Sequence, residues 1–162
     1  MYSLLGDALI GLFASSGDER ESSMKCVIGI LVAAVMLTSV PARAQEADKV
    51  AKAETAALAW LALTDAGDFA PSWHQAASIF QASITQQHWV DALTRVRGPL
   101  GPLVSRKVIS ARYATSLPGA PDGEYVVIRY ETEFTNGKEA VETVTPCLEK
   151  DGSWKVSGYY IK

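Results

Sequence analysis

Few residues in this sequence have types and spacings that could do chemistry. His74 and His88 are separated by a predicted helix break, and neither has a Cys, Asp or Glu at metal-ligand spacing. The sequence contains no Gly-x-Ser-x-Gly nucleophile elbow and no glycine loop of the phosphate-binding kind. Asp65 and Asp68 fall at a predicted helix end and cap, where a structural role is the more common one. We therefore expect no metal, no cofactor and no catalytic residue.

Two sets of side chains could bind a ligand. The first is expected to line a cleft between helices and sheet: Trp60, Trp73, Trp89, Tyr113, Tyr130, Thr143, Thr145 and Tyr160. A mostly apolar concavity with a few polar groups is typical of small-molecule sites, although the same residues could form a fully packed core.

The second set is basic. Between Asp91 and Asp122 the chain has no acid, and this stretch holds a basic corner made of Arg95, Arg97, Arg106, Lys107 and Arg112. Such a corner could suit an anionic ligand, an acidic partner or a lipid head group. Alternatively, its arginines pair with glutamates across the sheet.

Three β-rich runs after Pro121 must position the cleft residues. Asn136-Gly137 and Asp151-Gly152 separate the runs, and both dipeptides favour two-residue hairpin turns. With such turns Thr135 lies opposite Lys138, and alternation assigns the two faces. The inner face then carries Val126, Ile128, Tyr130, Thr132, Phe134, Val141, Thr143, Thr145, Cys147, Trp154, Val156, Gly158 and Tyr160. Glu131, Glu133 and Glu142 fall on the other face.

The residues before these runs are predicted to be mainly helical. Apolar residues recur at three- and four-residue spacing over 46–66, over 71–81 and from Ser83 or Thr85 through Arg97. Gly67 and Gly98-Pro99 are natural helix stops, and 104–116 reads as a strand. The predicted fold class is α+β, with three helices packed on one face of a curved four-stranded antiparallel sheet.

The N-terminus predicts export. Met24-Lys25, an apolar run from Cys26 to Val40 and an Ala-x-Ala ending at Ala44 are the three regions of a secretory signal peptide, in order. We expect a signal peptide at 24–44 that is cleaved after Ala44, rather than an uncleaved anchor. Residues 1–23 carry acids before Lys25. We expect translation to start at Met24 and these residues to be wrongly assigned coding sequence, with a genuine extended leader as the alternative. A single α+β domain would then span 45–162, periplasmic or secreted, with no membrane span after cleavage.

After that cleavage Cys147 is the only cysteine, which excludes an internal disulfide. We expect its thiol to be buried on the inner face between Val126 and Val156, rather than free to pair between chains. The net charge of −3 gives no electrostatic case for nucleic-acid binding.

A series of motifs resembles the domain of unknown function 4019 family, small secreted bacterial proteins, from about Val50 to the C-terminus. They are Trp60 with Asp65 and Gly67-Asp68, Ser72-Trp73, Trp89-Val90, Arg97-Gly98-Pro99-Leu100-Gly101, Arg106, Leu117-Pro118-Gly119, Pro121-Asp122-Gly123-Glu124-Tyr125, Glu142-Thr143-Val144 and Trp154 to Ile161. The resemblance implies a Gram-negative periplasmic setting and no established activity. The element order also looks like the cone-shaped folds of nuclear transport factor 2 and cystatin, which imply no particular chemistry.

A cone-fold enzyme of the isomerase or cyclase type would need a desolvated carboxyl base and a tyrosine donor inside the cone. Tyr113, Tyr130 and Tyr160 could donate, but the register above leaves the inner face without a carboxyl. We therefore expect a non-catalytic module that binds a small molecule or an envelope protein, with such an enzyme or a structural assembly module of the cell envelope as alternatives. A homodimer could form through apolar residues of the outer face: Tyr125, Val127, Val144, Leu148, Tyr159 and Ile161.

Overall fold

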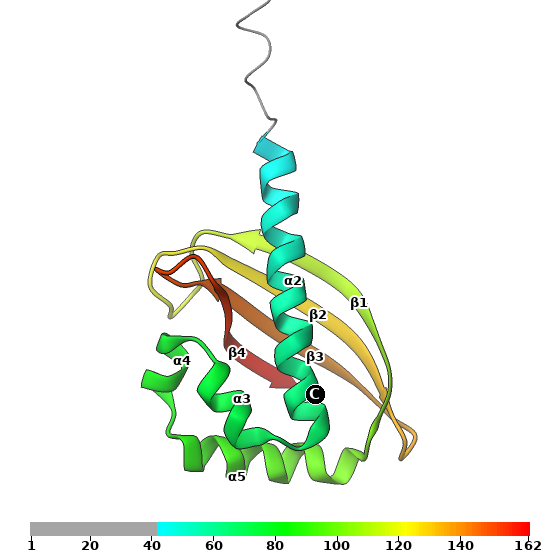
Figure 1. Ribbon diagram of the computed structural model, residues 1–162. Helices are drawn as coiled ribbons and strands as arrows, with labels where there is room; N and C mark the ends of the chain where they lie inside the picture. The colour runs from blue at the N-terminus through cyan, green and yellow to red at the C-terminus, as the bar shows by residue number, and fades with distance from the viewer. Residues whose placement is uncertain (1–41) are drawn as a thin grey trace, which may run out of the picture. The chain divides into compact units, whose positions relative to one another are not determined.

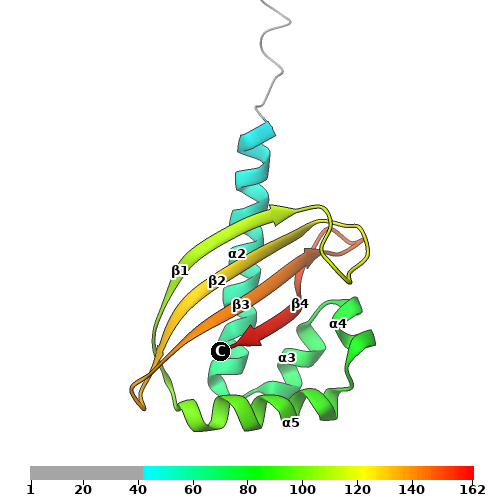
Figure 2. The same ribbon diagram turned by 180° about the vertical axis from the view of Figure 1, so that it is seen from behind.

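The computed structural model describes residues 42–162, in which helices precede strands. The helices are α2 (Ala42–Ala66), α3 (Phe69–Gln75), α4 (Ser78–Ser83) and α5 (Gln86–Arg97), followed by the 3₁₀ turn η1 (Gly98–Leu100). The strands are β1 (Leu103–Ala114), β2 (Tyr125–Phe134), β3 (Lys138–Leu148) and β4 (Trp154–Ile161), and they form one antiparallel sheet in that order. The helices lie on one face of this curved sheet (Figures 1 and 2). The predicted α+β class is confirmed.

The predicted extension 1–23, and the predicted signal peptide except for its last three residues, lie outside the described residues. Residues 42–162 form one compact unit. Within this range no helix is both long enough and apolar enough to cross a membrane.

Helix α2 stops where the sequence predicts. Gly67 has a φ of 81°, its N–H donates to Thr64 O, and the Asp68 N–H donates to Leu63 O. This pair of bonds satisfies two carbonyls of the last helical turn and is the usual glycine-ended C-cap. The chain therefore turns sharply from α2 into α3.

The second predicted helix is in fact two. Ala76 and Ala77 have extended backbone angles that separate α3 from α4. The Ala77 N–H donates to Val156 O at 2.8 Å, so this break pairs with the free edge of β4. A tertiary hydrogen bond has overridden the local helical pattern of residues 71–81.

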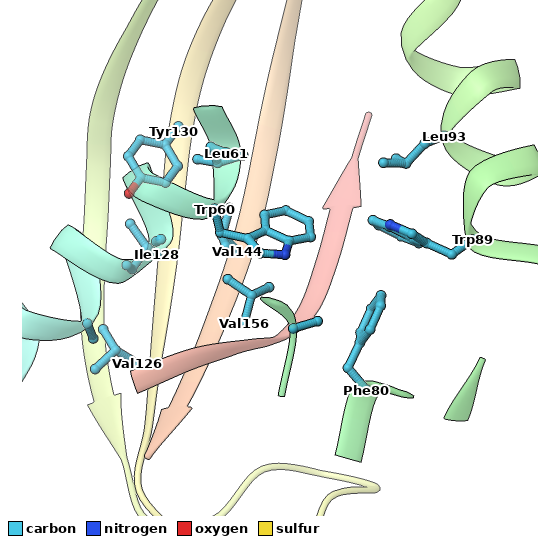
Figure 3. Close-up of a cluster of buried hydrophobic side chains, with 13 residues drawn as sticks. Trp60, Leu61, Phe80, Trp89, Leu93, Val126, Ile128, Tyr130, Val144 and Val156 are labelled. Atoms are coloured by element: carbon cyan, nitrogen blue, oxygen red, sulfur yellow. The ribbon is translucent and has the colours of Figure 1, made fainter. Parts of the chain in front are cut away.

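One apolar core joins the helices to the sheet (Figure 3). Its helical members include Trp60, Leu61, Phe80, Trp89 and Leu93, and its strand members include Val126, Ile128, Tyr130, Val144 and Val156. Ser72 is buried beneath two of the indoles: Trp60 Nε1 donates to its carbonyl at 2.8 Å, and Trp89 Nε1 donates to its hydroxyl at 3.0 Å. Both buried indole N–H groups thus have partners, as burial requires.

The predicted register between β2 and β3 is wrong by one residue. Phe134 pairs with Lys138, so the loop has three residues, with Gly137 at a φ of 66°; this is the next most common hairpin loop after the two-residue turns. The loop is anchored, because the Thr135 N–H donates to Pro102 O and Asn136 Nδ2 donates to Pro99 O. A one-residue shift exchanges the two faces of a strand.

The inner face of β3 therefore differs from the prediction. Glu142 pairs with Tyr130, and Val144 pairs with Ile128, so Glu142 and Val144 face inward. Thr143 and Thr145, predicted to face inward, lie on the outer face. So does Val141.

The second glycine corner also turns in three residues. The Glu149 N–H donates to Ser153 O, and Leu148 pairs with Trp154. A β-bulge then follows at Ser157, since Thr145 pairs with Gly158 and Pro146 pairs with Val156. Pro146 has no N–H to donate to the ladder, which fits an irregularity at this point.

The bulge decides which residues of β4 face the helices. Trp154 and Val156 face inward as predicted, but beyond the bulge Tyr159 and Ile161 face inward, because they pair with the inward residues Val144 and Glu142. Tyr160, predicted to be inside, is 62 % exposed. Of the apolar residues assigned to an outer docking face, Val144, Tyr159, Leu148 and Ile161 are therefore on the inner side.

Cys147 is buried as predicted, but not at the predicted place. It pairs with Tyr125 and Lys155 and packs in a small separate cluster with Ala77 and Tyr125, covered by Leu117 and Ala120 of the β1–β2 loop. Burial raises the pKa of this thiol, which makes it less reactive.

Candidate functional site

Four charged side chains meet at one end of the core and form what we call the ion cluster: Asp65, Arg97, Arg106 and Glu142. Arg106 donates from Nη1 and Nη2 to the two oxygens of Asp65, at 2.7 and 2.9 Å, and from Nε to Glu142 Oε2 at 2.7 Å. Arg97 Nη2 donates to Asp65 Oδ1 at 2.5 Å. The cluster joins α2, α5, β1 and β3, and its two positive charges balance its two negative ones.

Glu142 lies at the buried end of this cluster. It is 0 % exposed and accepts hydrogen bonds from Thr132 Oγ1 and Tyr159 OH, both at 2.6 Å, besides the bond from Arg106. The sequence-based conclusion that the inner face lacks a carboxyl is thus wrong, because the first hairpin turns in three residues. Even so, the three donors occupy this carboxylate, and burial withholds it from a ligand that would need a base.

The two tyrosines beside Glu142 differ in their hydrogen bonds. Tyr159 donates to Glu142, and burial together with that carboxylate raises the pKa of Tyr159. The Tyr130 hydroxyl is buried without a hydrogen-bond partner among the described residues, and burial raises the pKa of Tyr130 to about 12. Both phenols therefore stay protonated at neutral pH.

Arg97 is the least satisfied member of the cluster. Its side chain is 5 % exposed, its guanidinium lies 4.4 Å from the centre of the Phe134 ring, and Nη1 lies 3.6 Å from Glu142 Oε1. Within the described residues, buried Nη1 has no hydrogen-bond partner. A hollow of about 230 Å³ lies beside Asp65 and Arg97, but their charges already balance, so it offers a ligand little uncompensated charge.

The predicted basic corner is divided between the interior and the surface. Arg97 and Arg106 belong to the ion cluster. The pair between Arg106 and Glu142 is one that the alternative interpretation held, whereas both arginines also pair with Asp65 of α2, which it did not name. Arg95, Lys107 and Arg112 are exposed, and Lys107 lies opposite Glu131 in the β1–β2 ladder. The five side chains are not brought together.

A larger hollow, of about 360 Å³, lies where α2 and α3 approach the edge of β4. We call it the α2–α3–β4 hollow. It is lined by Ala56, Ala59, Trp60, His74, Gln75, Trp154, Lys155 and Val156. Its wall is apolar and polar in nearly equal parts, and His74 and Gln75 are exposed polar residues of it. Among the described residues that line it, none carries a carboxylate.

The predicted cleft residues do not share one opening. Trp60, Trp89 and Tyr130 are all packed in the core, and of these three only Trp60 also borders the hollow. Trp73 packs against that core and donates from Nε1 to Ile84 O at 2.9 Å. Tyr113 packs on the far side of α2, where its hydroxyl accepts from Lys49 Nζ at 3.3 Å. Thr143, Thr145 and Tyr160 cannot border a cleft between helices and sheet, because they lie on the outer face.

Sequence reasoning missed most of the residues that line the hollow. Ala56, Ala59 and Trp60 occupy one helical stripe at three- and four-residue spacing, and two alanines beside a tryptophan leave space that larger side chains would fill. That spacing is the signal that could have indicated a hollow. No residue spacing could have predicted that His74, at the end of α3, and Trp154 line the same hollow.

Metal chemistry has no support in the part of the chain that the structure describes. Residues 42–162 contain no group of three His, Cys, Asp or Glu side chains placed to hold a metal ion. Of the histidines, His74 stacks edge-on against Trp73, with ring centres 5.2 Å apart.

Fold and site together define a small α+β domain with a balanced internal ion cluster and two hollows, the larger of which is the α2–α3–β4 hollow. A family model described as "Protein of unknown function (DUF4019)" matches residues 56–159. The chain belongs to this family, and the resemblance inferred from its motifs is confirmed. A search of curated proteins and a search of solved structures gave no match. The likeness to the cone folds of nuclear transport factor 2 and cystatin stays a prediction.

Proposed function

We propose that this protein is a secreted, periplasmic binding module that holds a small molecule in the α2–α3–β4 hollow and catalyses no reaction. The observation that carries the proposal is the hollow itself. Its volume of about 360 Å³ falls in the range of ligand sites, roughly 300–1,000 Å³, and its wall combines apolar side chains with polar groups that could orient a ligand.

The packing around the hollow supports this choice of site. The centre of the helix–sheet interface is close-packed by Trp60, Trp89 and the inner valines, so a ligand would have no room there. The hollow lies beside that core, against the edge of β4, where α3 ends and the chain breaks before α4. A site at this edge can open without unpacking the core.

The chemistry of the hollow favours binding over catalysis. Catalysis of the isomerase type would need a carboxyl base within reach of the ligand, and the inward-facing Glu142 is held by Arg106, Thr132 and Tyr159. His74 is the one side chain of the hollow of a type that commonly serves as a general base, and it has no carboxylate partner among the residues lining the hollow.

The proposed location rests on residues 24–44 and can be tested directly. We expect the full chain, expressed in a Gram-negative host, to appear in the periplasmic fraction with its N-terminus at Gln45. Mass spectrometry of the intact protein would give the cleavage point. Replacing Ala44 by Phe should block processing, because signal peptidases need small residues there. Unprocessed wild-type protein in the cytoplasm would rule out secretion.

Binding can be tested on the same preparation by native mass spectrometry. We expect a small molecule to accompany the wild-type protein and to be absent from Ala59→Phe, in which a larger side chain fills the hollow. Ala62→Phe is the matched control, because Ala62 is an exposed residue of the same helix that does not line the hollow. If no small molecule co-purifies with the wild type, or if Ala59→Phe still binds the molecule that does, the proposed site is wrong.

A further inference from the structure

Two tryptophans border the α2–α3–β4 hollow, and Trp60 is the more deeply buried of the two. Trp60 comes from α2 and Trp154 from the start of β4, while Ala56 and Ala59 leave the space between helix and strand unfilled. Aromatic rings attract other rings in offset or edge-to-face contacts, which a saturated ring of equal volume cannot reproduce. A wall that includes Trp154 would therefore favour a planar ligand over a saturated one of equal volume.

One of these rings is held in place before any ligand arrives. The Trp60 indole donates to Ser72 O at 2.8 Å and packs against the rings of Trp89 and Tyr159, with centres 5.9 and 5.5 Å away. A ring that is already fixed loses little freedom on binding, and such preorganisation improves affinity.

The polar groups of the hollow are mostly uncharged. His74 and Gln75 belong to the last turn of α3 and can donate and accept hydrogen bonds. Lys155 also lines the hollow, and because it pairs with Cys147 in the β3–β4 ladder, strand alternation directs its side chain to the outer face. A ligand would therefore find hydrogen-bonding groups and no fixed charge of either sign.

We propose that the hollow takes a planar aromatic molecule of one or two fused rings that carries a neutral hydrogen-bonding group, such as a hydroxyl. This inference rests on the proposed binding function and specifies its ligand. Trp154 contacts the rings, the edge of the largely buried Trp60 borders them, and His74 or Gln75 receives the polar group. The volume of about 360 Å³ is near the lower end of ligand sites, which sets the limit on ring number.

Titrations with three matched probes test the inference: 2-naphthol, its saturated analogue decahydro-2-naphthol and the anion 2-naphthoate. The full-length gene would be expressed, and the protein would be used as it is purified from the cells, with whatever N-terminal processing has occurred. Its four tryptophans give separate indole N–H signals in NMR spectra, from which Kd can be read. We expect 2-naphthol to bind about tenfold more tightly than the saturated analogue and no less tightly than 2-naphthoate.

Variants show whether the aromatic wall is responsible. Trp154→Leu should remove the preference for the planar probe, and Trp154→Phe should retain it. Ala59→Phe should abolish probe binding and Ala62→Phe should not. NMR spectra of each variant would report whether it is folded, so a loss of binding can be separated from a loss of structure.

The outcomes separate the two proposals. Equal affinity for the planar and saturated probes, or tighter binding of 2-naphthoate, would overturn the ligand class and leave a binding site in place. If no probe binds but a co-purified molecule is lost from Ala59→Phe, the ligand class again fails alone. If no probe binds and no molecule co-purifies, both proposals are wrong.

Discussion

The buried ion cluster shows what a single carboxylate contributes to this protein. Replacing Glu142 by Gln removes one negative charge and leaves Arg106 and Arg97 partly uncompensated in the interior. Breaking a buried pair in this way typically costs about 3 kcal/mol or more. We expect a loss of that size in the free energy of unfolding, measured with urea.

The control for that prediction is Glu139→Gln. Glu139 lies on the same strand but is exposed, so its replacement should change stability by no more than about 0.5 kcal/mol. Equal effects of the two substitutions would show that the ion cluster does not stabilise the fold.

The two tyrosines beside Glu142 predict opposite effects of one substitution. Tyr159→Phe removes a hydrogen bond to a carboxylate, at 2.6 Å, and should lower the free energy of unfolding by about 1.5 kcal/mol or more. Tyr130→Phe removes a buried hydroxyl that has no partner among the described residues and should raise it by about 1 kcal/mol. Urea unfolding of both variants checks the pair, and a destabilising Tyr130→Phe would reveal a partner such as buried water.

Tyr130 also predicts how stability changes at alkaline pH. Its pKa rises from an ordinary 10.0 to about 12 on folding, so above pH 10 the unfolded chain loses this proton first. Stability contributed by the neutral phenol is therefore present below pH 10 and lost as the pH rises toward 12. Between pH 10 and 12 the free energy of unfolding, measured with urea, should fall less steeply for Tyr130→Phe than for the wild type. Identical slopes would contradict the prediction.

At the scale of elements, the β2–β3 hairpin is held by its contact with the turn before β1. Gly101 has a φ of 79°, and a Cβ there would lie 2.6 Å from Thr135 Oγ1 in the hairpin loop. Gly101→Ala should therefore cost about 1–3 kcal/mol through backbone strain and displacement of the loop. Thermal unfolding would measure it.

A second glycine nearby provides the control. Gly98 has ordinary helical angles, and a Cβ there would meet nothing within 4 Å. Gly98→Ala should be neutral or stabilise by up to about 1 kcal/mol, because it restricts the unfolded chain. If both alanine variants behave alike, the contact between hairpin and turn does not hold the loop.

Most elements could be predicted from the sequence, because their boundaries depend on local residues. Gly67 ends α2, Thr85 caps α5 by accepting from the His88 N–H, and Asn136-Gly137 and Asp151-Gly152 mark the hairpins. The number of residues in each turn could not be predicted. It depends on where the loop is anchored, for example at Pro99 and Pro102, and those contacts are distant in sequence.

At the scale of the whole molecule, the unpredicted length of the hairpin turns changed which residues reach the candidate site. A loop longer by one residue moved Thr143 and Thr145 outside and Glu142 inside, and the Ser157 bulge exchanged Tyr160 for Tyr159. The full lining of the hollow was beyond sequence reasoning, because α3 and β4 are far apart in the chain. The hydrogen bond from Ala77, just after α3, to Val156 of β4 is a tertiary contact.

The chain as a whole should not depend on its buried thiol for assembly. Cys147 is covered by Ala77, Tyr125 and the β1–β2 loop, so we expect Cys147→Ser to leave the migration of the protein on a non-reducing gel unchanged. Loss of a cross-linked species in the variant would show that the thiol is accessible and pairs between chains.

The three-donor grip on Glu142 also acts as a check on strand alignment. If the β2–β3 loop were one residue shorter, Val141 or Thr143 would face Arg106. One positive charge in the apolar interior would then lack its partner, and the Glu142 carboxylate would lie on the outer face. In such a misaligned chain Asp65 alone would have to balance both buried arginines. Arg106 and Glu142 therefore destabilise the wrong strand register as well as stabilise the native one. Because β4 pairs with β3, the native register also sets the position of β4 and of Trp154.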